Sequence, residues 1–159
     1  MNSLTTDLLG LVAKVYDSDG RRLPPVNGVK SIPTLEPGVS RPISPQLAER
    51  FRFASRWERA MCGQTFLSIE ELADVPSDRD MMDIIACRTE NWPASPPAIL
   101  PRRSVSLLSV NVEQSEPVFL IWEDADTEPS IVSYISNFES RYLDLNDLLT
   151  DYCGSANDQ

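Results

Sequence analysis

The first stretch of the chain carries apolar residues at helical spacing. Thr5 or Thr6 can cap this helix, because a side-chain hydroxyl accepts hydrogen bonds from free N–H groups of the first turn. The turn-forming run at residues 17–20 is expected to end it. The apolar stripe consists of Leu8, Leu9, Leu11, Val12, Val15 and Tyr16.

Residues 24–45 contain six prolines. Proline fixes φ and provides no N–H group, so we expect an extended connector without regular structure there. A second helical pattern begins at Ser44 and Pro45, and Gly63 is expected to cap its C-terminal end. The stripe of this predicted helix consists of Leu47, Phe51, Ala54, Trp57 and Met61.

Shorter elements are expected between residues 66 and 101. Phe66 and Leu67 form an extended piece, and Ser68 with Glu71 makes a capping box for a brief helix. Ser77 or Asp80 can cap a further helix that carries the apolar residues at 81–85. The stretch from Trp92 to Pro101 contains four prolines and is expected to be a loop.

The spacing changes to that of strands after residue 104. The alternation at 105–112 predicts a strand that is irregular near Leu108, and the apolar run at 117–122 predicts a central strand covered on both faces. A third strand at 131–135 follows an acidic turn, and Asp144 caps a last helix. Helices followed by a strand meander indicate the α+β class.

We therefore predict a single α+β domain with an antiparallel sheet of about three to six strands flanked by helices. Residues 1–43 are interpreted as an N-terminal helix and proline-rich connector, 44–153 as the main domain and 154–159 as a tail. A chain of 159 residues is long enough for one such core.

Charge is distributed unevenly along the chain. Residues 1–112 carry thirteen acidic and thirteen basic residues, whereas residues 113–159 carry eleven acidic residues and one base, Arg141. The net charge of −10 therefore lies in the last third. Such a field favours a basic protein partner and disfavours nucleic acid and anionic membranes, although acidic side chains also simply keep a solvated face soluble.

Several kinds of chemistry lack their usual residues. The chain has no histidine, no phosphate-binding glycine motif and three widely spaced cysteines without a CxxC pair, so we expect no catalytic residues, metal or cofactor. The acidic run at 123–128 does not fit an EF-hand loop, because Pro129 stands where glycine is required and Ile135 where the bidentate Glu belongs. An exposed turn, a partner contact and a metal or catalytic site remain alternatives for this run.

The location of the protein is expected to be cytoplasmic. The N-terminal residues lack the basic region and cleavage site of a signal peptide, and no run of about 20 apolar residues occurs. The unpaired cysteines agree with a reducing compartment.

From Ser44 to Cys153 the chain resembles the SUKH superfamily, which includes bacterial toxin-immunity proteins and fungal cell-wall-synthesis regulators. The resemblance lies in the predicted helix at 46–61, the segment at 66–72, the strand at 117–122, Asn137-Phe138 and the residues at 145–149. Members commonly show Asn-Gly after the first core helix, where this chain has Cys62-Gly63. The resemblance implies a non-catalytic α+β domain that binds and neutralises a toxin, often a nuclease.

These observations together predict an immunity or inhibitor protein that occludes a basic toxin domain with an acidic surface. A regulatory or scaffold module that binds through the proline-rich segment and Trp92 is the alternative, and deleting residues 1–43 is the simplest way to distinguish the two. Neither hypothesis predicts an oligomeric state. The predicted partner-binding residues are Glu123, Asp124, Asp126, Glu128, Glu139 and Trp92.

Overall fold

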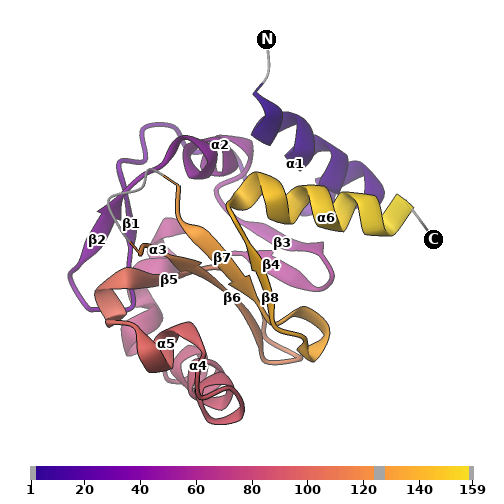
Figure 1. The fold of residues 1–159 in the computed structure, drawn as a ribbon. Helices are drawn as coiled ribbons and strands as arrows, with labels where there is room; N and C mark the ends of the chain where they lie inside the picture. Colours follow the sequence, from indigo (N-terminus) through magenta and orange to yellow (C-terminus); the bar gives the residue numbers. More distant parts are fainter. Residues whose placement is uncertain (1–2, 124–127, 158–159) are drawn as a thin grey trace.

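Helices and short strands are mixed in the first part of the chain, and the second part is a run of strands followed by a last helix, as drawn in Figure 1. The computed structural model describes residues 3–123 and 128–157, with side chains to residue 154. The α-helices and strands are α1 (Leu4–Val15), β1 (Ser31–Pro33), β2 (Ser40–Pro42), α2 (Pro45–Phe53), β3 (Trp57–Met61), β4 (Gln64–Phe66), α3 (Ile69–Asp74), α4 (Arg79–Asn91), α5 (Pro96–Ile99), β5 (Val105–Asn111), β6 (Glu116–Ile121), β7 (Ser130–Ser133), β8 (Ser140–Tyr142) and α6 (Leu145–Asn157).

Strands β3 to β8 form one antiparallel sheet in which the spatial order follows the chain order. Consecutive strands therefore pair with each other, as expected for a meander. Strands β1 and β2 form a separate two-stranded hairpin. The protein is a single α+β domain, and the predicted fold class is confirmed.

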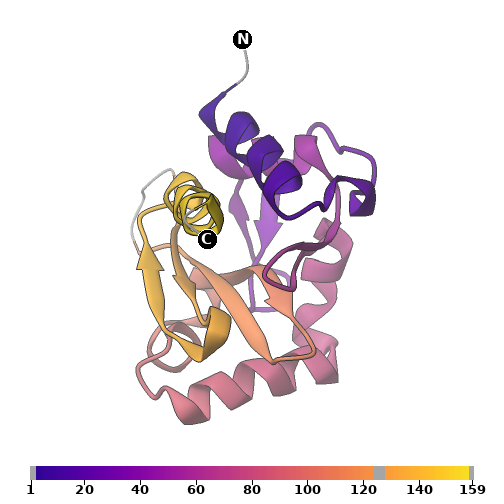
Figure 2. The ribbon, with the colours of Figure 1, turned by 90° about the vertical axis from the view of Figure 1, so that its right-hand side faces the viewer.

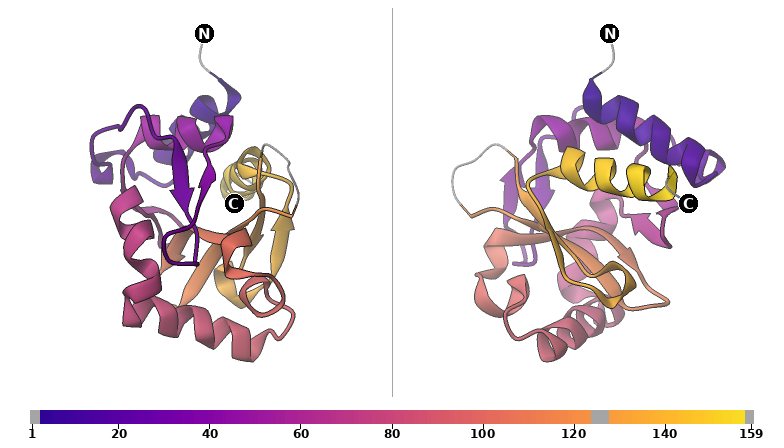
Figure 3. Two further views of the ribbon diagram at one scale, coloured as in Figure 1. Left: turned by 90° about the vertical axis from the view of Figure 1, so that its left-hand side faces the viewer. Right: turned by 45° about the vertical axis from the view of Figure 1, so that its right-hand side comes forward.

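Helices cover both faces of the six-stranded sheet. Figure 2 shows α1 and α6 on one side and α4 along the other, and the right-hand view of Figure 3 shows the sheet between these layers. All six residues of β6 are buried, which is the result predicted for the apolar run at 117–122. Within the described residues no helix is long and apolar enough to cross a membrane.

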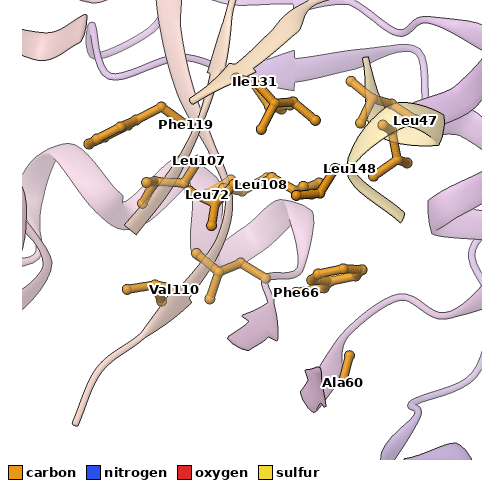
Figure 4. Packing of buried hydrophobic residues seen from close by; sticks show 14 of the residues in the cluster. Leu47, Ala60, Phe66, Leu72, Leu107, Leu108, Val110, Phe119, Ile131 and Leu148 are labelled. Carbon is orange, nitrogen blue, oxygen red and sulfur yellow. The ribbon is translucent and has the colours of Figure 1, made fainter. Parts of the chain in front are cut away.

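The core extends across the whole domain, including the N-terminal segment. Leu9 and Val12 of α1 are fully buried and α1 packs along α6. Ile32 of β1 is also buried. Figure 4 labels Leu47 of α2 and Leu148 of α6 among the members of this cluster. The hairpin corrects the prediction that residues 24–45 lack regular structure.

The predicted helix from residue 45 to Gly63 is wrong in its second half. Helix α2 ends at Phe53, and the chain continues as β3, which turns through Cys62 and Gly63 into β4. Both turn residues have positive φ, 48° and 73°, as in the two-residue turns that suit the twist of a hairpin. Gly63 is therefore a hairpin residue and not a helix cap.

A buried arginine binds the chain where α2 ends. Arg50 is 2% exposed, and its guanidinium donates to the carbonyls of Ala54 and Ser55, just beyond the helix, and to the carbonyl of Leu67, which follows β4. Its side chain also lies against the ring of Phe51. The contacts to Ala54 and Ser55 satisfy carbonyl groups at the C-terminal end of α2, and the contact to Leu67 ties that end to the residue after β4. Burial lowers the pKa of Arg50 to about 9.

Helix caps and strand ends differ from the prediction at several positions. Ser3 caps α1 instead of Thr5 or Thr6, and Asp78 caps α4 instead of Ser77 or Asp80. The predicted loop after Trp92 contains the short helix α5. Strand β7 ends at Ser133, and β8 was not predicted. The capping box of Ser68 and Glu71, the irregularity near Leu108 and the Asp144 cap are confirmed.

Candidate partner-binding site

A pocket of about 410 Å³ opens beside β7 and β8, close to the start of α6. We call it the β7–β8 pocket. Its walls combine apolar side chains of the sheet with carboxylates and one arginine. The lining residues are Ile121, Trp122, Glu123, Glu128, Ser130, Ile131, Val132, Arg141, Tyr142, Leu143 and Asp147.

Strand pairing brings the basic and apolar parts of this wall together. Val132 lies opposite Arg141, and Ile121 lies opposite Ser130. Directly opposite residues project to the same face of a sheet, so Arg141 stands beside Val132. The Arg141 side chain is 56% exposed and its guanidinium lies 3.6 Å from Glu139. Such an exposed and long ion pair holds the side chain only weakly, which leaves it free to reorient.

Three carboxylates line the β7–β8 pocket, and two of them are held in place by backbone N–H groups. Glu128 accepts a 2.9 Å hydrogen bond from the N–H of Gln46, in the first turn of α2. Asp147 accepts a 3.0 Å hydrogen bond from the N–H of Leu143. Glu123 is exposed. We refer to Glu123, Glu128 and Asp147 as the pocket carboxylates, and only Arg141 opposes their charge within the lining.

Gln46 joins the starts of two helices next to this pocket. Its amide nitrogen donates to Asp144 at 3.1 Å, and its amide oxygen accepts from the N–H of Asn146 at 2.9 Å. Asp144 itself accepts from the N–H of Asp147 and so caps α6. The acidic side chains here therefore serve two helix N-termini, where negative charge is stabilised by the helix dipole. This arrangement fixes where the negative charge is presented.

The other predicted residues lie on either side of Tyr134. Glu139 accepts a 2.9 Å hydrogen bond from the Tyr134 hydroxyl, and the ring of Trp92 lies 5.4 Å from that of Tyr134. Trp92 is half-buried, with the Arg88 guanidinium over its ring. Burial, together with the hydrogen bond to Glu139, raises the pKa of Tyr134. Trp92 thus packs as part of a cluster, and Glu139 reaches the pocket through Arg141.

The structure brings Glu123 and Glu128 into one pocket and connects Glu139 to it, whereas Asp124 and Asp126 lie outside the described residues. Sequence reasoning missed Arg141, Leu143 and Asp147 as lining residues. Arg141 carried one signal, since it is the single base among the last 47 residues. Leu143 carried none, because the short strand before it has no recognisable periodicity.

The groups that could support chemistry are sparse in the described part of the chain. No cluster of three or more histidine, cysteine, aspartate or glutamate side chains there is arranged to hold a metal ion. The three cysteines are free thiols, and burial raises the pKa of Cys62 and of Cys153. A raised pKa leaves less of the nucleophilic thiolate near neutral pH.

Comparison with known proteins gives no match: no family model, no curated protein and no solved structure is similar to this chain. The resemblance to the SUKH superfamily stays a prediction.

Proposed function

We propose that this protein is a non-catalytic inhibitor that binds a basic protein partner, of the toxin-domain class, through the β7–β8 pocket and its acidic surroundings. The observation that carries the proposal is the concave site whose lining contains three carboxylates, Glu123, Glu128 and Asp147, and one arginine, Arg141. A lysine or arginine of the partner would find an excess of negative charge there.

The fixed position of the carboxylates supports this function. Glu128 and Asp147 are each held by a backbone N–H group, so they lose little conformational freedom when a partner binds. Electrostatic complementarity of this kind mainly raises the association rate and selects the partner, while apolar contacts hold the complex. Salt should therefore weaken binding mainly by slowing association.

The expected place of action is the cytoplasm, where reducing conditions keep Cys62, Cys87 and Cys153 as thiols. A partner that is toxic inside the cell would have to be neutralised there. Occlusion needs no catalytic group, which agrees with the absence of histidine from the chain.

The first experiment is an affinity capture with three baits: the wild-type chain, a pocket variant and a control variant. The pocket variant carries Glu123→Gln, Glu128→Gln and Asp147→Asn, which remove charge but keep an oxygen acceptor for the backbone N–H groups. The control variant carries Glu58→Gln, Asp83→Asn and Glu90→Gln, which neutralise three exposed carboxylates outside the pocket lining.

We expect wild type and control to retain a basic protein at low salt, and the pocket variant to lose it. Adding the wild-type chain to that protein should suppress its activity, with nuclease activity tested first. Equal capture by all three baits, or capture that is unaffected by salt, would contradict the proposal.

A scaffold function through the proline-rich segment needs a different test from the deletion of residues 1–43. That deletion removes the buried residues Leu9, Val12 and Ile32, so it would unfold the domain. Substituting the exposed Leu23 and Val26 with serine disturbs the same segment at its surface. Loss of the partner with these two substitutions, and not with the pocket variant, would favour the scaffold.

A further inference from the structure

The geometry points to β8 as the docking edge for this partner, and we propose that an extended segment of the partner, carrying a lysine or arginine, adds to the sheet as a strand beside β8. This inference rests on the proposed function and specifies how the partner is held. Four features of the described residues support it: one closed sheet edge, one open edge, two exposed apolar side chains and the charge of the adjacent pocket.

The opposite edge of the sheet, β3, is closed by the chain itself. Arg22 forms an isolated antiparallel bridge with Trp57, and the N–H of Leu23 donates to the carbonyl of Arg56 at 2.9 Å. The guanidinium of Arg21 donates to the carbonyls of Glu58 and Arg59, at 3.1 and 3.0 Å. Unpaired strand edges are templates for association, and here three consecutive residues block one of them.

The edge formed by β8 has no such cover. Strand β8 pairs with β7 on one side and stands last in the strand order. In the parts of the chain that the structure describes, no segment pairs with the outer side of β8. Figure 2 shows this strand, in gold, along the left-hand margin of the ribbon. Its outer backbone groups can therefore pair with an added strand.

Two exposed apolar side chains bracket this open edge. Leu143, directly after β8, is 82% exposed, and Phe138, two residues before it, is 73% exposed. Among the described residues these are the most exposed large apolar side chains. Large apolar residues at such positions are typical anchors of a binding surface. An added strand would cover both.

The negative charge of the adjacent pocket determines which side chain the added strand should carry. Leu143 and Arg141 line the same pocket as Glu123, Glu128 and Asp147, so a strand beside β8 would place a side chain next to these carboxylates. A basic side chain is the complementary choice. A second copy of this chain is disfavoured as the occupant, because pairing two β8 edges would bring identical pocket carboxylates and the two Arg141 side chains together.

The test uses a random 12-residue peptide library displayed on phage, selected on the intact chain at low salt. We expect the enriched peptides to alternate apolar residues with lysine or arginine. Binding of the strongest synthetic peptide should weaken about tenfold in Phe138→Ser and in Leu143→Ser. The matched controls Val112→Ser and Ile99→Ser, at side chains 58% and 61% exposed, should bind as wild type does. All four variants should retain the wild-type melting temperature, since none removes a buried side chain.

Amide hydrogen exchange of residues 138–143, with and without the peptide, gives the second readout. We expect protection of amides in β8 on binding. The two readouts distinguish an error in strand addition from an error in the proposed acidic site. If the pocket variant loses the peptide while the β8 amides and the two serine variants are unaffected, strand addition is wrong and the acidic site stands.

If the peptide protects the β8 amides and binds the pocket variant as tightly as wild type, strand addition is supported and the proposed role of the pocket carboxylates is wrong. If no peptide is enriched, strand addition is overturned, because an open edge with exposed anchors should accept an isolated extended peptide.

Discussion

The buried guanidinium of Arg88 donates to the side-chain oxygen of Asn137 at 2.6 Å, and Asn137 holds its backbone at a φ of 60°. The same guanidinium donates to the carbonyl of Ser115 at 2.9 Å, where φ is 53°. Arg88 therefore joins α4 to two turns in left-handed conformations, one between β5 and β6 and one before β8. Left-handed backbone is costly for residues other than glycine, so other contacts must hold it.

Replacing Arg88 with methionine should lower the free energy of unfolding by about 2–5 kcal/mol, because the carbonyl of Ser115 and the amide of Asn137 lose their buried donor. Arg88→Lys should cost less but still destabilise, since one ammonium group cannot reproduce the two-sided fork of the guanidinium. Urea denaturation of both variants measures these costs. A wild-type urea midpoint for Arg88→Met would show that the hydrogen bonds of Arg88 to Ser115 and Asn137 do not stabilise the fold.

The pair Asn137→Ala and Asn137→Gly separates the hydrogen bond from the backbone strain. Both lose the bond to Arg88, but glycine adopts positive φ without penalty and alanine does not. We expect Asn137→Ala to be less stable than Asn137→Gly by about 1 kcal/mol. Equal stability of the two variants would show that backbone strain does not contribute there.

Elements with one strong local signal could be predicted from the sequence. The apolar run at 117–122 is β6, and Ser68 with Glu71 forms the expected capping box. The stretch from Trp57 to Met61 was wrongly predicted as helix, because its buried residues also fit a helical stripe. Long-range contacts decide its conformation: Trp57 packs edge-on against Phe66, and its indole N–H donates to the carbonyl of Ser18 at 2.8 Å.

The candidate site was predicted in part for a similar reason. The excess of acidic residues is visible in the composition, and Glu123 and Glu128 do line the pocket. The bond between Glu128 and Gln46, and the placement of Asp147, depend on contacts between distant parts of the chain. A three-residue edge strand such as β8 has too few residues to show alternation.

Glu128 should prove structural as well as functional. Glu128→Ala removes the acceptor at the first turn of α2 and should lower the free energy of unfolding by about 1 kcal/mol. Glu128→Gln keeps an oxygen acceptor and should cost less, while it removes the charge proposed to attract a partner. Thermal unfolding of the two variants, compared with Glu123→Gln as an exposed control, tests this separation. If alanine and glutamine cost the same, the carboxylate does not act as a cap.

Gly63 should be difficult to replace. Its φ is 73°, and a Cβ atom there would overlap the side-chain amide of Asn111. Gly63→Ala should therefore cost about 1–3 kcal/mol, from the left-handed backbone and from the displacement of Asn111. The double variant Gly63→Ala with Asn111→Ala removes the steric part and should recover some of that loss. If the double variant recovers nothing, backbone strain alone explains the cost.

Stability at alkaline pH should depend on partly buried tyrosine side chains. Burial and a 2.7 Å hydrogen bond to Asp151 raise the pKa of Tyr142 above its ordinary value of 10.0, and burial raises the pKa of Tyr152 and Tyr16. A folded-state pKa above the unfolded value means that the folded chain keeps protons that the unfolded chain loses above pH 10. The stabilisation from these groups is therefore complete below pH 10 and is lost as the pH rises further.

The difference between wild type and Tyr142→Phe isolates the tyrosine contribution. Between pH 7 and 9 we expect the free energies of unfolding of the two proteins to differ by a constant amount. Above pH 10 the free energy of unfolding of Tyr142→Phe should fall less steeply with pH than that of wild type, and the two slopes should differ by at most the contribution of one proton. Urea denaturation at pH 8, 9, 10 and 11 measures this. Parallel curves across the whole range would show that Tyr142 ionises alike in the folded and unfolded chains.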